Sequence, residues 1–359
     1  MTRPPHTSPP DPPDDFGSWD FAAQKALYLE LATGALHQWG FTVDALDWLA
    51  YSSNAVFALR AAGARYVLRL SLAGRVKESR LRSELEWLRA IRQGTDLAAP
   101  DPVTLRVGGE ERLYALASHE SLPPPHRVFC VLFQHIEGQR KSARELNPAD
   151  CRRIGRYLGR LHLDAQFDPP AGFDRPRLDW RGLFDAESPY QSAAESLPLA
   201  ARQRDVFADV AARVGQVMAR LDGEPASFGL IHADLLSKNA LFRPDSVAAL
   251  DFEYSGWGYF NYDLAPLLWE LRGERTADGA RLEDALLDGY RSARPDAQLD
   301  WEALEAFIAA RQLASCRWLL QNRHHPNVRA AAPDLIRQRA AELEQYLRSG
   351  ELRRQSPTL

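Results

Sequence analysis

Cysteine is scarce in this chain, which has three among its 359 residues. Cys130, Cys151 and Cys316 lie far apart in the sequence and form no Cys-x-x-Cys pair. The sequence therefore predicts neither a disulfide framework nor a zinc site. We expect reduced, mostly buried thiols in a cytoplasmic protein.

Long apolar runs and a large excess of one charge are absent as well. No apolar stretch approaches membrane-spanning length, so no membrane partner is expected. The formal net charge of -4 gives no reason to expect a nucleic-acid partner through bulk attraction. Small-molecule or protein substrates are more natural.

The first eighteen residues, Met1–Ser18, have proline at positions 4, 5, 9, 10, 12 and 13 and no apolar core segment. This composition excludes an ordinary secretory signal. We expect a disordered tail, and a polyproline docking ligand is the alternative. The whole chain is 45% hydrophobic and long enough for two domains or one bilobal domain.

One stretch gathers polar residues between short apolar runs. Leu230-Ile231 and Ala240–Phe242 bracket a polar loop, and Val247–Leu250 leads directly into an acidic residue. These runs predict a hairpin-like element in a core, with three polar residues at its rim: Asp234, Asn239 and Asp251. Mg²⁺ prefers carboxylate and amide oxygens together with water and phosphate. A carboxylate can also accept a proton from an alcohol that attacks a phosphoryl group.

The order of these residues carries a resemblance. His232-Ala233-Asp234-Leu235, then Asn239, then Asp251-Phe252 resembles the catalytic loop and metal-binding motif of protein kinases. Ala233 stands where protein kinases have arginine, and Ala249–Ala265 resembles a signature of the phosphotransferase superfamily. The chain is therefore more similar to the aminoglycoside phosphotransferase and choline kinase branch.

This resemblance implies an α+β, bilobal protein-kinase-like fold that covers nearly all of Trp19–Leu347. A small lobe with an antiparallel sheet plus a helix (residues 19–134) would bind the nucleotide, and a larger, mostly helical lobe (residues 135–348) would hold the catalytic and substrate site. Residues 1–18 and 349–359 would be tails. ATP would bind in the cleft, Asp234 would be the catalytic base, and Asn239 and Asp251 would hold Mg²⁺.

The nucleotide site is expected in the first lobe. A helix within Trp19–Trp39 precedes three predicted strands, Ala45–Tyr51, Ala55–Ala61 and Arg65–Ser71. A small polar turn between two strands can offer N–H groups and hydroxyls to phosphates. The turn between the first two strands has the residues for this role: Ser52, Ser53 and Asn54.

Arg69 stands in the third strand, where the kinases that this chain resembles carry a lysine or arginine that holds the phosphates. Glu84, in a predicted helix over Lys77–Gln93, would pair with Arg69 and fix it, and Glu86 is the alternative partner. Two solvated surface charges are the other interpretation of Arg69 and Glu84.

The apolar strand Val128–Phe133 runs into a segment that ends at Gly138 and resembles the hinge of the kinase-like fold. We expect the Gln134 carbonyl and the Ile136 N–H to face adenine, and His135 to point to solvent.

Helices are predicted after the hinge, the last of them over Pro333–Arg348. His162 is interpreted as a buried, hydrogen-bonded histidine, because it resembles the Leu-His pair that ends a helix in this superfamily. An aromatic run, Trp257, Tyr259, Phe260 and Tyr262, favours core packing over a substrate pocket. Several basic residues favour a solvated helix end over an anion or metal site: Arg311, Arg317, Arg323, His324 and His325.

The predicted function is an ATP-dependent O-phosphotransferase that acts on a hydroxyl-bearing acceptor. The acceptor is left open among aminoglycoside, choline-like amino alcohol, homoserine, sugar, and Ser/Thr on protein. Choline would call for an aromatic and acidic cage, aminoglycosides for a wide acidic pocket, and homoserine for an arginine near the cleft. A Ser/Thr protein kinase or a nucleotide-binding pseudokinase scaffold is the alternative, and the intact Asp234, Asn239 and Asp251 argue against the pseudokinase.

Overall fold

A computed structural model describes residues 16, 19–51, 53–71, 76–122, 125–164, 167–184, 199–222, 227–274, 278–322 and 325–353. Ser52, Arg323, His324 and most of the two expected tails lie outside these residues. The chain forms two compact units. The first comprises residues 1–77, 103–132 and 324–326, and the second comprises residues 78–102, 133–323 and 327–359.

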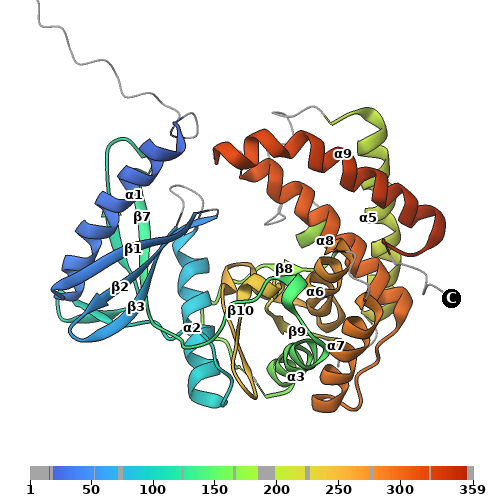
Figure 1. The fold of residues 1–359 in the computed structure, drawn as a ribbon, viewed down its shortest axis with the longest axis horizontal. Coiled ribbons are helices and arrows are strands. Elements are labelled where there is room, and N and C mark those ends of the chain that lie inside the picture. The colour runs from blue at the N-terminus through green and yellow to red at the C-terminus, as the bar shows by residue number, and fades with distance from the viewer. Residues whose placement is uncertain are drawn as a thin grey trace, which may run out of the picture. The chain divides into compact units, whose positions relative to one another are not determined.

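The first unit is built on a five-stranded sheet with the order β1-β2-β3-β7-β6 (Figure 1). The strands are β1 (Val43–Tyr51), β2 (Asn54–Ala61), β3 (Ala64–Ser71), β6 (Ala115–Ser118) and β7 (Arg127–Gln134). The pairs β1–β2, β2–β3 and β6–β7 are antiparallel. The expected antiparallel sheet is therefore confirmed. A separate hairpin joins β4 (Leu105–Val107) to β5 (Glu110–Arg112).

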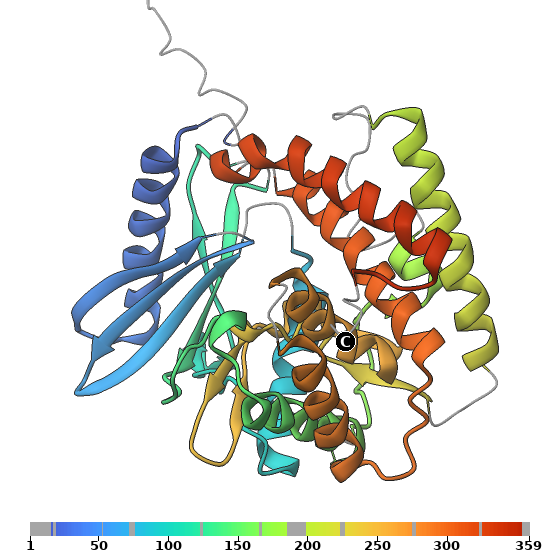
Figure 2. The same cartoon turned by 45° about the vertical axis from the view of Figure 1, so that its right-hand side comes forward.

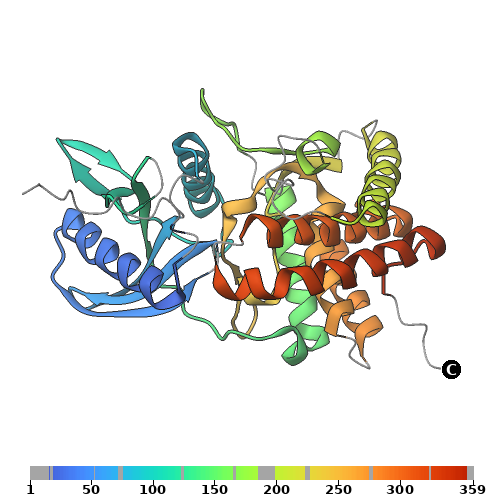
Figure 3. The ribbon, with the colours of Figure 1, turned by 90° about the horizontal axis from the view of Figure 1, so that it is seen from above.

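The core of the first unit lies between this sheet and helix α1 (Phe21–Leu36), which runs along the sheet (Figures 1 and 3). The Asp20 carboxylate caps α1 by accepting from the Ala23 N–H at 2.8 Å. The helical segment ends at Gly40, whose φ of 71° is left-handed, as glycine permits. Alternate side chains of β2 and β3 are buried against α1, because successive residues of a strand face opposite sides.

The second unit is mainly helical. Its helices are α2 (Glu78–Gly94), α3 (Pro148–Asp164), α4 (Trp180–Phe184), α5 (Ala201–Leu221), α6 (Phe260–Glu274), α7 (Gly279–Ala293), α8 (Trp301–Gln321) and α9 (Pro326–Ser349). The last helix begins earlier than the expected start at Pro333, which lies inside α9. The preceding Ala330–Ala332 are strong helix formers, which extends the helix backwards.

Two small sheets accompany these helices. One has the order β8-β12-β9, formed by β8 (Arg177–Leu178), β12 (Gly256–Tyr259) and β9 (Phe228–Ile231). The other is the hairpin of β10 (Ala240–Phe242) and β11 (Val247–Ala249). Both apolar runs that flank the polar loop are therefore strands, as expected.

Helices α3 and α7 pack with their backbones almost in contact. A Cβ atom on Gly155 of α3 would lie 2.0 Å from the Leu286 carbonyl oxygen, and one on Gly289 of α7 would lie 2.1 Å from the Arg152 carbonyl oxygen. Only glycine allows this approach. The apolar side chains of α3 are buried, among them Ile154, Leu158 and Leu161.

Helix α8 is buried over most of its surface and packs on both α5 and α6 (Figure 2). Tyr259, Phe260 and Tyr262 are buried too, which confirms that most of the aromatic run belongs to the core. The three cysteines are free and buried. Among the described residues, no helix has both the length and the apolar character required to cross a membrane.

Candidate active site

The polar loop of the second unit brings the ends of several strands together. In the β10–β11 hairpin, Ala240 pairs with Ala249, so Asn239 and Leu250 lie next to each other at the open end of the hairpin. The Leu250 N–H donates to the Asn239 carbonyl at 2.8 Å. Asp251, the next residue, therefore follows directly from the strand end beside Asn239.

Asp234 and Asn239 are in direct contact. The Asn239 Nδ2 group donates to the Asp234 backbone carbonyl at 2.9 Å and to Asp234 Oδ2 at 3.2 Å. Both partners are acceptors, so the amide N–H₂ must face Asp234, and the amide oxygen of Asn239 is directed elsewhere. Both side chains are buried.

His232 links Asp234 to the strand that carries Asp251. Its Nδ1 accepts from the Asp234 N–H at 3.2 Å, and its Nε2 lies 2.9 Å from the Leu250 carbonyl, to which it must donate. His232 therefore has a structural role in the loop. Ala233 and Asp251 have left-handed backbones with φ of 67° and 64°, strained conformations of the kind that cluster at active sites.

The Asp263 carboxylate of α6 binds the backbone of the polar loop. Asp263 Oδ2 accepts from the His232 N–H at 2.8 Å, and Asp263 Oδ1 accepts from the Ala233 N–H. His162 of α3 donates its Nε2–H to Asp263 Oδ2 at 2.9 Å, and its Nδ1 accepts from the Tyr290 hydroxyl at 2.9 Å. The expected buried, hydrogen-bonded His162 is confirmed.

The charges of this network follow from its contacts. Burial lowers the pKa of His162 below its usual value and outweighs the attraction of Asp263, so the imidazole is neutral. Burial alone would raise the pKa of Asp263, but the hydrogen bond from His162 and the contacts with His232 lower it, so the carboxylate is ionised.

Arg175 supports the turn that follows Asp251. The buried guanidinium donates to the carbonyls of Ser255, Glu253 and Phe252 and, through Nη1, to the Arg80 carbonyl of α2 at 3.0 Å. This side chain ties the turn to a helix. Sequence reasoning found neither this residue nor the role of Asp263.

Arg311 corrects an expectation. The sequence favours a solvated helix end, whereas Arg311 is buried in α8 and donates from Nη2 to Asp234 Oδ1. Arg317 is also largely buried and donates to the carbonyls of Leu183 and Phe184. In the first unit, His325 is buried against Phe21 and Tyr51. The signal for Arg311 was available, since it stands inside the apolar run Phe307–Ala314.

Two further side chains border the Asp234–Arg311 pair. Glu270 accepts from the Ser237 N–H at 2.7 Å and from its hydroxyl at 2.9 Å, and burial raises the pKa of Glu270. Trp269, beside it on α6, has the Arg311 guanidinium 5.5 Å from its ring centroid. The loop thus lies between acidic groups and one buried cation.

The residues that the sequence predicts for nucleotide binding are distributed over both units. In the first unit, Arg69 lies in β3 opposite Val56, and Asn54 begins β2 opposite Ser71, directly after Ser53 in the turn. In the second unit, Glu84 is buried in α2, and the Gln134 N–H donates to the Asp101 carbonyl at 2.9 Å. Ile136 and His135 are half-buried, and His135 lies 3.8 Å from Glu137. Arg69 and Glu84 belong to different units, and their pairing stays a prediction.

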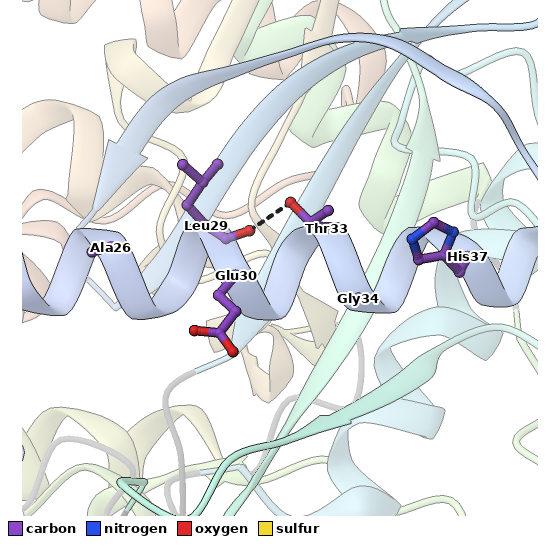
Figure 4. A pocket seen from close by; sticks show the side chains of 6 residues that line it. All are labelled: Ala26, Leu29, Glu30, Thr33, Gly34 and His37. Carbon is purple, nitrogen blue, oxygen red and sulfur yellow. Dashed lines mark hydrogen bonds between the residues drawn. The ribbon is translucent and has the colours of Figure 1, made fainter.

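No group of three or more His, Cys, Asp or Glu side chains suitable for a metal occurs in the described part of the chain. Asp251 and Asn239 offer one carboxylate and one amide oxygen, so this pair is not among the groups of three that such a description covers. A surface hollow on α1 is lined by Ala26, Leu29, Glu30, Thr33, Gly34 and His37 (Figure 4). It contains none of the predicted site residues.

Comparison with known proteins adds independent findings. The model of the phosphotransferase enzyme family matches residues 49–307. A homoserine kinase of Methylobacterium sp. (strain 4-46) is 30% identical over 315 residues, which are 82% of this chain and 86% of the relative. An amicoumacin kinase of Bacillus subtilis (strain 168) is 23% identical over 240 residues, 66% of each chain.

Among solved structures, a microcompartment-associated aminopropanol kinase is similar with a TM-score of 0.74 and 24% identity. The match covers 90% of this chain and 99% of that one. The expected kinase-like fold is thereby confirmed.

Proposed function

Because the chain belongs to the phosphotransferase enzyme family and is therefore a small-molecule kinase, we propose that it transfers the γ-phosphoryl group of ATP to an alcohol hydroxyl. Asp234 accepts the proton of that hydroxyl. The single observation that carries this proposal is the fixed Asp234 carboxylate, held by Arg311 on one oxygen and by Asn239 on the other.

This arrangement supports a base because it sets the direction of the carboxylate. A proton acceptor must lie within hydrogen-bonding reach of the attacking hydroxyl, and small displacements cost much of the rate. His232 and Asp263 fix the backbone on either side of Ala233, so Asp234 has little freedom to move. Alignment is the main contribution that this loop makes.

Asn239 and Asp251 would hold Mg²⁺. The amide oxygen of Asn239 is directed away from Asp234, and Asp251 follows the neighbouring strand end, so both can supply the oxygen ligands that Mg²⁺ prefers. Two protein ligands are the usual number when substrate phosphates complete the shell. When bound, the ion neutralises negative charge on the phosphates.

ATP would be bound by the residues that the sequence predicts for this role. The turn Ser52, Ser53 and Asn54 would contact its phosphates, with Arg69 fixed by Glu84, and the Gln134 carbonyl and Ile136 N–H would face the adenine. The β2–β3 hairpin that carries Asn54 and Arg69 supports this assignment. A solved amicoumacin kinase that is 18% identical, with a TM-score of 0.66, is described in complex with AMP-PNP and Ca²⁺.

For the acceptor we propose a small aliphatic alcohol that carries an amino group, with homoserine as the first candidate. Relatives from several bacteria are named homoserine kinase, and one that is 29% identical, from Gluconobacter oxydans, is covered over 88% of its length. The arginine that homoserine binding would require is present beside Asp234.

The test is steady-state phosphorylation of homoserine with Mg²⁺-ATP by the wild type and by Asp234→Asn. We expect the substitution to lower kcat by about 10³-fold or more while nucleotide binding, followed by fluorescence, stays intact. Asp245→Asn, on the exposed turn of the β10–β11 hairpin, is the matched control and should retain full activity. A wild type that binds ATP without transferring phosphate to any alcohol or protein would instead support the pseudokinase alternative.

A further inference from the structure

We propose that Glu270 of α6 is a positioning residue that orients the Asn239 end of the polar loop. The proposal rests on the function proposed above, because Asn239 is assigned there to Mg²⁺. Asp263 binds the loop before Asp234, and Glu270 binds it again after Asp234. Asp234 therefore lies between two carboxylate anchors that belong to one helix.

The first argument is the contact between Glu270 and Ser237. Glu270 Oε2 accepts from the Ser237 N–H at 2.7 Å, and Glu270 Oε1 accepts from the Ser237 hydroxyl at 2.9 Å. Ser237 begins the 3₁₀ turn Ser237–Asn239 and is only 2% exposed. The first N–H groups of a helical turn have no acceptor within the turn, and a buried N–H requires one. Glu270 supplies this acceptor from 33 positions away in the chain.

The second argument is the spacing of the two anchors along α6. Asp263 and Glu270 are about two helical turns apart, and residues at that spacing lie on the same face of a helix. Asp263 accepts from two backbone N–H groups before Asp234. Glu270 accepts from the backbone N–H of Ser237, which follows Asp234. One face of α6 therefore fixes the backbone on both sides of Asp234.

The third argument is the link from Ser237 to Asn239. Both residues belong to the same short turn, in which the Asn239 N–H donates to the Leu236 carbonyl at 2.9 Å. On its other side, the Asn239 carbonyl accepts from the Leu250 N–H of the hairpin at 2.8 Å. A displacement of Ser237 therefore tilts the turn while the hairpin end stays fixed, and it redirects the Asn239 amide relative to Asp234.

Charge is the other way in which Glu270 can act on Asp234. Burial and, to a smaller extent, the negative charge of Asp234 raise the pKa of Glu270, so the two carboxylates repel each other. Glutamine separates the two effects, because it has the shape of glutamate without its charge. Its Oε1 can accept from the Ser237 N–H while its Nε2 donates to the Ser237 hydroxyl, which accepts as well as donates. A positioning role therefore survives in Glu270→Gln and is lost in Glu270→Met.

The first measurement is hydrogen exchange of the free protein, followed by mass spectrometry of peptides that cover residues 234–239. In Glu270→Met we expect this segment to exchange about tenfold faster or more, because the Ser237 N–H has lost its charged acceptor. Glu270→Gln should recover most of the protection. Glu274→Met is the matched control, since Glu274 is a carboxylate of the same helix that pairs with Arg144. It should leave the exchange of residues 234–239 unchanged.

The second measurement tests the consequence for Asn239. Electron paramagnetic resonance follows the binding of Mn²⁺, a paramagnetic substitute for Mg²⁺, in the presence of AMP-PNP. Glu270→Met should raise the apparent Kd for Mn²⁺ about 10- to 100-fold, as is typical when a group that orients a metal ligand is lost. Glu270→Gln should recover most of this loss, and Glu274→Met should bind as the wild type does. A purely structural role would lower the melting temperature and leave the Kd of the folded molecules unchanged.

The proposal is overturned if Glu270→Met keeps the wild-type exchange of residues 234–239 or the wild-type Kd for Mn²⁺. It is equally overturned if Glu270→Gln loses as much as Glu270→Met, since the charge would then be the property that matters. If Glu270→Met does not fold, Ser237→Ala replaces it, because this change removes only the hydroxyl bond. Ser237→Ala should shift both measurements in the same direction by a smaller factor, and Ser237→Thr should recover the loss. Wild-type values in Ser237→Ala would then refute the proposal.

Failure of the proposed function has a different signature. If the wild type transfers phosphate to no alcohol, or binds no Mn²⁺, the assignment of Asp234 or Asn239 fails. Hydrogen exchange of the free protein needs neither substrate nor metal, and it still decides whether Glu270 holds the loop. Faster exchange in Glu270→Met that Glu270→Gln reverses supports the positioning role, and equal exchange refutes it.

Discussion

Asp263 provides the sharpest test of how this enzyme holds the loop that carries Asp234. The carboxylate accepts from the His232 N–H, the Ala233 N–H and His162 Nε2, and both of its oxygens are used. Asp263→Asn replaces one oxygen by an N–H₂ group of the same size. Whichever way the amide turns, one backbone N–H of the loop then faces another donor.

The magnitude follows from that mismatch. A buried donor without an acceptor costs about 1–3 kcal/mol, and the lost hydrogen bonds to a charged group are worth about 1.5–3 kcal/mol. We expect the free energy of unfolding to fall by roughly 2–4 kcal/mol, a large part of the 5–15 kcal/mol typical of proteins. The shift of the loop that relieves the contact should lower kcat by about 100-fold, because a displacement of ~1 Å can cost that much.

Asp150→Asn is the matched control, since Asp150 is equally buried but binds Lys141 and Arg153 instead of the loop. Urea unfolding and kcat per folded molecule should be measured for both variants. Asp150→Asn should lose stability and keep its kcat. A normal kcat in Asp263→Asn, or equal losses of kcat in both variants, would refute the claim that Asp263 positions the loop.

Three further predictions concern pH, packing and the Asp251 turn. Because burial lowers the pKa of His162, the unfolded state binds more protons than the folded state below about pH 6.5. As the pH is lowered below this value, the free energy of unfolding should decrease by at most about 1.4 kcal/mol per pH unit. His162→Gln should reduce this slope in urea unfolding measured at several pH values. Gly289→Ala should destabilise the folded protein strongly, since the new Cβ would lie 2.1 Å from the Arg152 carbonyl oxygen. Gly34→Ala in α1 is the control, because a Cβ there meets open space, and it should raise the free energy of unfolding by about 0.5–1 kcal/mol in thermal or urea unfolding. Arg175→Met should loosen the turn after Asp251 and so raise the Mg²⁺ concentration required for half-maximal turnover. An unchanged Mg²⁺ titration would contradict that role of Arg175.

The fold could be predicted well from the sequence because its signals are local. The strands before and after the Ser53 turn, the helix ended by Gly40 and the apolar runs around the polar loop all depend on neighbours in the chain. The expected start of α9 at Pro333 is wrong, because the alanines before this proline continue the helix.

The site was predictable only where its residues form one motif. Asp234 and Asn239 are five positions apart, and the structure brings them into contact. Arg311 is 77 positions from Asp234, so no local pattern links them. Asp263 and Arg311 each interrupt an apolar helical segment, which marks a charge with a buried partner, but the partner itself depends on tertiary packing. Arg175 stands in an irregular segment, where periodicity gives no signal.

The suspension of the loop from Asp263 has a consequence for engineering. The anchor lies on α6 and α3, whereas the cation that touches Asp234 comes from α8. Helices α3 and α6 thus hold the loop, and a third helix, α8, supplies the cation that contacts Asp234. Randomising α8 around Arg311, in a library that leaves His162 and Asp263 intact, should therefore change the surroundings of Asp234 while the loop keeps its backbone conformation.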